Sequence, residues 1–227
     1  MASKTKNLSV FLALAAVSFC GGCEMLGVLG SPRRSEGKVP AEYDLREHKD
    51  QKILVLVDQP GWLNAQTNLR YYLTDAINKN IIVNLRINPE NLIEYGRLSL
   101  LRSNRADFSL LGPVEIGTAL DANTVLLVTI EDCQLSEVGE PNYYKGLLSA
   151  RAALLDTASG KKLWPKSDDS KSINVGFDIE ERGREIAVIR LAGACAYCTV
   201  RYLYDCPRNK FEIPEDRCDV DWGRWDK

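Results

Sequence analysis

The sequence predicts an α/β fold, in which a mixed β-sheet is covered by packed helices. Two observations predict it. Continuous apolar runs of strand length alternate with segments of helical spacing in the first half of the chain. Shorter apolar runs separated by turn residues follow in the second half. Alternating elements followed by hairpins imply one domain over residues 51–205, with the order β-α-β-α-(short α)-β-β-β-(β)-α.

The first four elements lie before residue 102. Residues 53–57 (ILVLV) form a continuous apolar run, which is typical of a strand buried on both faces. Apolar side chains then recur at helical spacing from Leu69 to Ile77, with Asn64 as the expected N-cap. Residues 81–87 resemble a second strand, and Pro89 is expected to begin a second helix.

The later elements are shorter and closer together. Gly112-Pro113 opens a short helix, and residues 124–130 (TVLLVTI) are rich in β-branched residues, as strands are. Residues 147–156 and 162–164 form strands joined by a turn, and residues 173–177 alternate like an edge strand. A closing helix is expected from Glu180 to about Tyr204. Its predicted apolar side consists of Ile186, Ile189, Leu191, Cys195, Cys198 and Tyr202.

The N-terminus has the pattern of an export signal. Lys4 and Lys6 precede an apolar run from Leu8 to Phe19. As a helix this run would span only about 18 Å, which is too short to cross a bilayer stably. A short apolar core behind positive charges is typical of a signal peptide, which we assign to residues 1–22.

The residues after this run resemble the lipobox of a bacterial lipoprotein signal. Gly21 and Gly22 place small side chains before Cys23, whereas the competing Cys20 follows the bulky Phe19. The resemblance implies that Cys23 carries two acyl chains, palmitate among them, and becomes the first mature residue. Two chains give stable membrane attachment. Residues 23–50, with glycines, prolines and charges, are expected to be the lipidated N-terminus and a flexible tether.

Two further segments resemble periplasmic lipoproteins with a TolB N-terminal-like (CsgG-like) domain. They are residues 117–123 (GTALDAN) before a strand, and residues 156–164 (DTASGKKLW) after one. The resemblance covers about residues 52–204. It implies a membrane-anchored envelope lipoprotein that faces the periplasm and binds other envelope proteins or copies of itself, and that is not an enzyme. Glu24, after the lipobox cysteine, favours the outer membrane by the same resemblance.

Composition excludes several classes of function. Twenty-nine basic and 31 acidic residues give a formal charge of -2, so no global field attracts nucleic acid. A single histidine, His48, excludes multi-histidine metal sites. The chain has no phosphate-binding glycine motif, and we expect no cofactor and no metal. Arg97, Arg102 and Arg105 form a loose basic cluster, interpreted as a solvated helix face or, alternatively, a contact for lipid head groups or peptidoglycan.

Trp62, in the loop after the first strand, is a candidate partner contact, because tryptophan is enriched in interface hot spots. The alternative is that its ring folds back over the core. Cys206 and Cys218 bracket a polar loop in the tail, residues 206–227. Since an exported protein meets an oxidising compartment, we predict that a disulfide joins them and pins the tail.

Cys195-Ala196-Tyr197-Cys198 is a CxxC motif with several interpretations. Deep in a predicted helix, it lacks the dipole that lowers a thiol pKa at a helix N-terminus. Core packing is the favoured interpretation, with a disulfide and a zinc site shared with Cys206 and Cys218 as others. A periplasmic thiol-active protein that uses Cys195 and Cys198 is the alternative function, and a cell-wall or small-molecule binder is a third.

Overall fold

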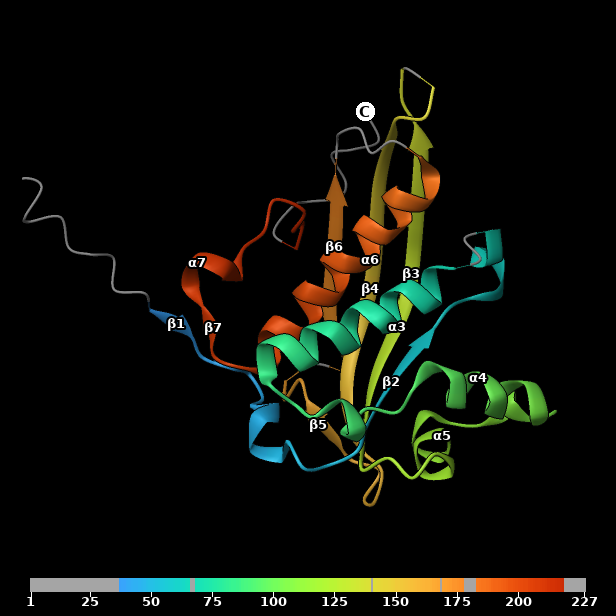
Figure 1. The fold of residues 1–227 in the computed structure, drawn as a ribbon, viewed down its shortest axis with the longest axis vertical. Coiled ribbons are helices and arrows are strands. Elements are labelled where there is room, and N and C mark those ends of the chain that lie inside the picture. The colour runs from blue at the N-terminus through green and yellow to red at the C-terminus, as the bar shows by residue number, and fades with distance from the viewer. Residues whose placement is uncertain (1–36, 66–67, 140, 168, 178–182, 219–227) are drawn as a thin grey trace, which may run out of the picture. The chain divides into compact units, whose positions relative to one another are not determined.

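The computed structural model describes residues 37–65, 68–139, 141–167, 169–177 and 183–218. Within them, five strands form the main sheet: β2 (Ile53–Asp58), β3 (Thr124–Glu137), β4 (Tyr144–Asp156), β5 (Lys162–Trp164) and β6 (Lys171–Phe177). β2 runs parallel to β3, and the other pairs are antiparallel. β5 pairs with the last residues of β4, and β6 pairs with its earlier part (Figure 1). The predicted mixed α/β sheet is confirmed.

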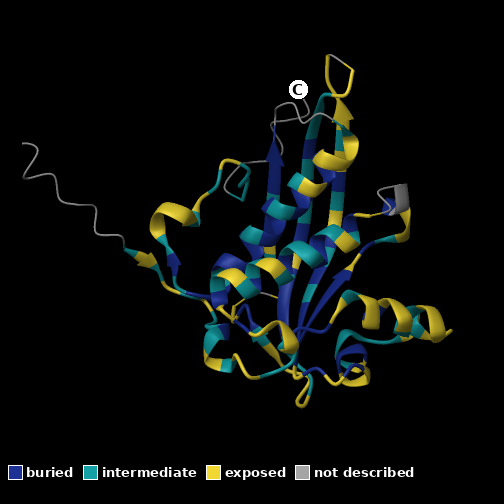
Figure 2. Ribbon diagram, in the orientation of Figure 1, coloured by how far each residue is buried: buried dark blue, intermediate teal, exposed yellow. Residues whose placement is uncertain are grey.

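Helices cover both faces of the sheet at β2. α3 (Leu69–Asn80) and α6 (Arg184–Val200) pack with Val55 and Val57, whereas α4 (Tyr95–Asn104) and α5 (Pro113–Ala119) pack with Leu54 and Leu56. Successive side chains of a strand point to opposite faces, so these two clusters lie on opposite sides of the sheet. This double coverage explains why β2 has a continuous apolar sequence, and Figure 2 shows it buried along most of its length.

The predicted strand over residues 81–87 is wrong. α3 does not break after Ile77 but continues into a π-helical turn, Ile81–Leu85, which ends at Arg86 with a φ of 58°. Ile81 and Leu85 are buried, while Val83 between them is 73% exposed. Spacing of four residues puts side chains on one helix face, whereas a strand would have buried every second residue.

Two predicted helix starts are also wrong. α3 begins after Asn68, so Asn64 is not its N-cap. Pro89 opens only a 3-10 turn, because the Ile93 N–H then donates to the Ile53 carbonyl (2.9 Å) before α4 starts. The chain between α3 and α4 therefore first meets the edge of β2.

The buried side of α6 differs from the predicted one. Ile186 and Ile189 are 51% and 45% exposed, whereas Leu191, Cys195 and Cys198 have no exposed surface. Ala187 and Val188 are buried in their place, so the start of the helix packs with a different side from the one predicted. The expected start of this helix, residue 180, lies outside the described residues.

The two segments that carry the lipoprotein resemblance, residues 117–123 and 156–164, connect neighbouring helices and strands of the fold. A Cβ on Gly117 would lie 2.5 Å from Val125 Cγ2, so glycine allows α5 to approach β3 closely. The Asn123 side chain accepts a hydrogen bond from the Lys52 N–H (2.8 Å), which fixes the start of β3 beside β2. Trp164 is fully buried, and its indole N–H donates to a carboxylate oxygen of Glu42 (2.8 Å).

The compact unit begins at Lys38, earlier than the predicted boundary at residue 51. β1 (Lys38–Val39) pairs with β7 (Cys206–Pro207), and Leu45 is fully buried in a 3-10 turn, Leu45–His48. The Arg46 guanidinium lies 2.5 Å from Asp44 and 2.8 Å from Asp205, and so joins the two ends of the unit. The sequence expected for the tether therefore overlaps the domain from Lys38 onwards.

The predicted disulfide is not formed in this structure. Cys206 and Cys218 are free thiols: the Cys206 sulfur lies 3.4 Å from the Tyr204 hydroxyl, and the Cys218 sulfur accepts from the Asn174 N–H at 3.4 Å. After α7 (Arg208–Phe211), the tail instead runs along β6, where the Gly176 N–H donates to the Glu215 carbonyl (2.8 Å). The prediction assumed that a polar tail lacks other means of attachment, and the structure supplies them.

A buried arginine holds this tail. Arg201 follows α6, is 3% exposed, and places Nη1 2.5 Å from an Asp216 carboxylate oxygen and 2.6 Å from the Phe211 carbonyl oxygen. Burial raises the Asp216 pKa, but hydrogen bonds from Cys218 and Arg201 outweigh it and leave that pKa below its usual value. The helical segment Arg184–Leu203 is long and apolar enough to span a bilayer, yet most of it is buried inside this domain.

Candidate functional site

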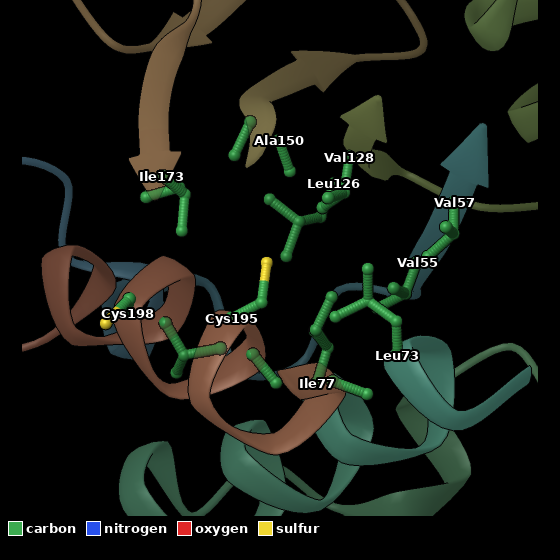
Figure 3. Close-up of a cluster of buried hydrophobic side chains, with 14 of the residues drawn as sticks. Val55, Val57, Leu73, Ile77, Leu126, Val128, Ala150, Ile173, Cys195 and Cys198 are labelled. Atoms are coloured by element: carbon green, nitrogen blue, oxygen red, sulfur yellow. The ribbon is translucent and has the colours of Figure 1, made fainter. Parts of the chain in front are cut away.

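The CxxC motif is part of the hydrophobic core. Cys195 and Cys198 have no exposed surface, and Figure 3 shows the Cys195 sulfur pointing from α6 toward the sheet. Burial raises the pKa of Cys195 to about 12 and raises that of Cys198 as well. A reactive cysteine needs an accessible thiol with a lowered pKa. The geometry therefore fits core packing and does not fit a nucleophilic thiol pair.

Metal ligation has no support in the described part of the chain. No group of three or more His, Cys, Asp or Glu side chains there could hold a metal ion. His48 stacks on the ring of Tyr43, with centroids 5.6 Å apart.

Trp62 points outward, contrary to the alternative that its ring folds back over the core. It lies in a 3-10 turn, Gly61–Ala65, shortly after β2, and is 68% exposed. The turn is anchored, because the buried Gln59 side chain donates to the Leu63 carbonyl (2.9 Å). A large aromatic side chain is thus presented to solvent by an anchored turn.

A groove of about 210 Å³ opens at the same end of β2. Its polar lining residues are Asp58, Arg102 and Ser109. Its apolar walls come from β2, β3, α5 and the α4–α5 connection: Leu56, Val57, Phe108, Leu111, Pro113, Ile116 and Leu127. In α/β sheets, ligands commonly bind outside the carboxyl ends of parallel strands, which is where this groove lies.

The predicted basic cluster separates into three different environments. Arg97 donates to the Leu120 carbonyl (3.4 Å), and exposed Arg105 pairs with Asp107 (2.9 Å). Arg102 is instead half-buried in the groove, with its guanidinium carbon 4.9 Å from the centre of the Phe108 ring. The solvated-face interpretation therefore fits Arg105 but not Arg102.

A second guanidinium, on α3, bonds to the backbone just after β2. Arg70 donates to the Gln59 carbonyl (3.3 Å), while its Nε is buried without a hydrogen-bond partner. Burial lowers the Arg102 pKa, and the Arg70 charge lowers it further. Among the described residues that line the groove, Arg102 is the one cation and Asp58 is the one carboxylate, so their charges balance.

Sequence reasoning missed Arg70 and Phe108. Neither residue stands in a recognisable motif, and Phe108 falls in the segment over residues 102–110 that has no helical or strand period. The signal that was available is the pair of Arg102 and Trp62, which the fold brings to the same end of β2.

No protein-family model and no curated protein matches this chain. Among solved structures, it is similar to lipoprotein GNA1162 from Neisseria meningitidis, with 18% identity over 63% of this chain and 94% of that chain (TM-score 0.40). The LpoB C-terminal domain from Salmonella enterica is 17% identical over 60% of this chain and 84% of that chain (TM-score 0.34). A PelC dodecamer from Paraburkholderia phytofirmans is 12% identical over 75% of this chain and 93% of that chain (TM-score 0.36).

Proposed function

We propose that this protein is a lipid-anchored envelope protein without catalytic activity, which binds or scaffolds other envelope components. The observation that carries the proposal is Trp62, which an anchored turn presents to solvent. Exposed tryptophans are favoured anchors of protein interfaces, because they bury a large area with little loss of side-chain entropy. Other envelope proteins are the proposed partners, and a second copy of the chain is the other candidate.

The membrane attachment in this proposal rests on the lipobox sequence. With Cys23 as the acylated first residue, about 15 residues separate the lipid from Lys38, where the compact unit begins. Fully extended, they reach at most about 50 Å, so the domain would work within that distance of the bilayer. We place it on the periplasmic side, and Glu24 favours the outer membrane.

Metabolic labelling tests the anchor. Radiolabelled palmitate should enter the wild-type protein and be lost from Cys23→Ser, while the matched control Cys20→Ser keeps the label. Label that persists in Cys23→Ser but disappears from Cys20→Ser would move the anchor to Cys20. No label in the wild-type protein would contradict lipid attachment altogether.

Site-specific photo-crosslinking in cells tests the binding role. A photoreactive amino acid at position 62 should form adducts with a small set of envelope proteins, or with a second copy of the chain. The control position is Val138, which directly follows β3 and is 50% exposed. Equal adducts at both positions would contradict the assignment of this surface.

The two alternative functions agree less well with the structure. A thiol-active protein would need an accessible pair at Cys195 and Cys198, and both are fully buried with raised pKa values. Small-molecule sites typically have about 300–1,000 Å³; the groove at β2 has about 210 Å³, and a hollow of about 480 Å³ at Asn142, Tyr143 and Gly183 lies largely open to solvent. A binding surface for proteins agrees better with both observations.

A further inference from the structure

We propose that the outer edge of β6 is a docking site for an extended acidic segment of a partner protein, and that residues 212–218 of this chain occupy the site as an autoinhibitory strap. This inference rests on the binding function proposed above and adds the chemistry of the partner. The strap itself shows which contacts the site offers, namely main-chain hydrogen bonds from β6 and two arginine side chains.

The edge of β6 binds the strap as a sheet binds a further strand. One edge of β6 pairs with β4, and the strap lies along the other, where it forms an antiparallel bridge. The Gly176 N–H donates to the Glu215 carbonyl (2.8 Å), and the Arg217 N–H donates to the Asn174 carbonyl (2.9 Å). An uncovered strand edge is a template for another chain, and proteins commonly recognise peptides by this main-chain pairing. A segment that replaces the strap must therefore be extended.

Two arginines, one on α6 and one directly after it, hold adjacent carboxylates of the strap. The Arg190 guanidinium lies 2.8 Å from Glu215 Oε1, and its carbon is 4.9 Å from the centre of the Phe177 ring. Arg201 places Nη1 2.5 Å from Asp216 Oδ2. Hydrogen bonds between guanidinium and carboxylate groups are about twice as strong as those between neutral groups. The site is therefore matched to two successive acidic residues.

The burial of Arg201 commits the site to an acidic occupant. This residue is 3% exposed, and a buried charge that loses its partner is strongly destabilising. A segment that covered the edge of β6 without a carboxylate would leave the Arg201 charge buried and unpaired. A partner that displaces Asp216 must therefore supply a carboxylate in its place.

The strap has the features of a segment that opens locally. Every residue from 211 to 218 keeps part of its surface exposed, and Phe211 and Ile213 pack only at the periphery of the main core. The Asn174 N–H donates to the Cys218 sulfur at 3.4 Å, and sulfur is a weaker acceptor than a carbonyl oxygen. Segments with few buried apolar contacts open at a lower free energy than the core. A partner strand with a carbonyl at this position would pair better with β6 than the strap does.

Fluorescence anisotropy with the purified full-length protein tests the site. The probe is a fluorescein-labelled peptide with the sequence of residues 211–218 and serine in place of Cys218. We expect weak, saturable binding to the wild type, because the strap competes at a high effective concentration. Glu215→Gln combined with Asp216→Asn, the strap variant, should bind the probe at least about tenfold more tightly. A probe with glutamine and asparagine at its two acidic positions should bind at least about tenfold more weakly.

A matched pair of arginine variants locates the carboxylate contact. In the strap variant, Arg190→Gln should weaken probe binding about tenfold, because the probe then lacks a charged partner for its glutamate. The control is Arg184→Gln, at the exposed start of α6, which should leave probe binding unchanged. Circular dichroism checks that each variant is folded.

Hydrogen exchange on the wild type keeps the inference testable if the strap variant does not fold. The amides of Gly176 and Arg217 should exchange faster than the Val128 amide in the core strand β3, because the strap opens without global unfolding. Excess unlabelled probe should speed exchange further at Arg217, on the displaced strap, and slow it at Gly176, which the probe then covers. Exchange of all three amides at one rate would contradict local opening.

Several outcomes would overturn the inference. They are equal probe affinity of the wild type and the strap variant, equal binding of the acidic and amide probes, and equal effects of Arg190→Gln and Arg184→Gln. A wild-type protein that binds no probe would make the strap a permanent cover of the sheet edge. The proposed function fails separately, since crosslinks at position 62 without probe binding would leave the binding function standing and overturn the strap. Probe binding without crosslinks would support the strap and overturn the contact at Trp62.

Discussion

Asp216→Asn should loosen the C-terminal segment, because it leaves the buried Arg201 charge without its ionic partner. The Arg201 side chain is 2% exposed and that of Asp216 is 16% exposed, and Nη1 and Oδ2 are 2.5 Å apart. The Arg201 guanidinium also packs 4.5 Å from the centre of the Phe211 ring, on the tail itself. The charge can therefore regain water only if the tail moves away from α6.

The expected cost follows from this burial. Removing one partner of a buried ion pair typically costs about 3–5 kcal/mol, and we expect about 3 kcal/mol for Asp216→Asn, because Asp216 is the more exposed partner. The control is Glu131→Gln in the exposed pair with Arg151, whose N–O distance is 2.6 Å. An exposed pair is worth about 0–1 kcal/mol. Arg201→Met combined with Asp216→Leu removes both charges and should cost less than Asp216→Asn alone.

Urea unfolding of the full-length protein measures these costs as shifts of the transition midpoint at constant slope. Hydrogen exchange at Gly176 and Arg217, whose N–H groups bond across the tail and β6, reports whether the tail detaches first. Equal losses in Asp216→Asn and Glu131→Gln would refute the reasoning, as would unchanged exchange at those two amides.

Three further predictions concern other parts of the fold. Hydrogen bonds from Arg46 lower the pKa values of Asp44 and Asp205 in the folded protein. The two carboxylates therefore stabilise the fold above about pH 4, and this stabilisation is lost as the pH falls through their folded pKa values. Arg46→Gln should flatten this acid dependence of the unfolding free energy, measured by urea melts at a series of pH values. Cys195 and Cys198 should react with iodoacetamide only after unfolding, as peptide mapping would show, and labelling in the native state would contradict their burial. Gly117→Ala should lower the free energy of unfolding by about 1–3 kcal/mol, because the added Cβ would clash with Val125 and Thr157. Gly96→Ala on α4, where an added Cβ meets no atom within 4 Å, should be neutral or slightly stabilising. Equal effects of the two variants in thermal melts would contradict the packing argument.

The pattern of apolar residues predicted those strands and helices in which the buried positions follow the spacing of the apolar residues. β2 is buried on both faces and β3 and β4 have one face in the main core, so an apolar run was a reliable sign of a strand in each. Residues 81–87 have the same composition but continue a helix, because burial there falls on Ile81 and Leu85 and leaves Val83 exposed. Composition alone cannot distinguish these cases, since neighbouring elements decide which side chains are covered.

The tail shows a second limit of sequence reasoning. Compartment and spacing favoured a disulfide between Cys206 and Cys218, whereas the structure attaches the tail through Arg201, Asp216 and backbone pairing with β6. An arginine at the end of an apolar helix carries no local sign that it will be buried. Its role depends on a partner 15 positions later in the chain, which only the folded structure brings into contact.

The candidate site was only partly predictable for the same reason. Trp62 could be identified because it follows a clear strand pattern. The groove at the same end of β2 also needs Arg102 from α4 and Phe108 from a segment without periodicity. Several apolar walls belong to the core cluster that also covers β2, so replacing them would change folding and binding together. Trp62 is exposed on its turn, and the groove-lining Arg102 and Ser109 are half-buried and exposed, so these side chains can be changed while the core is kept. A binding defect can therefore be separated from a folding defect at these three positions and not at the walls.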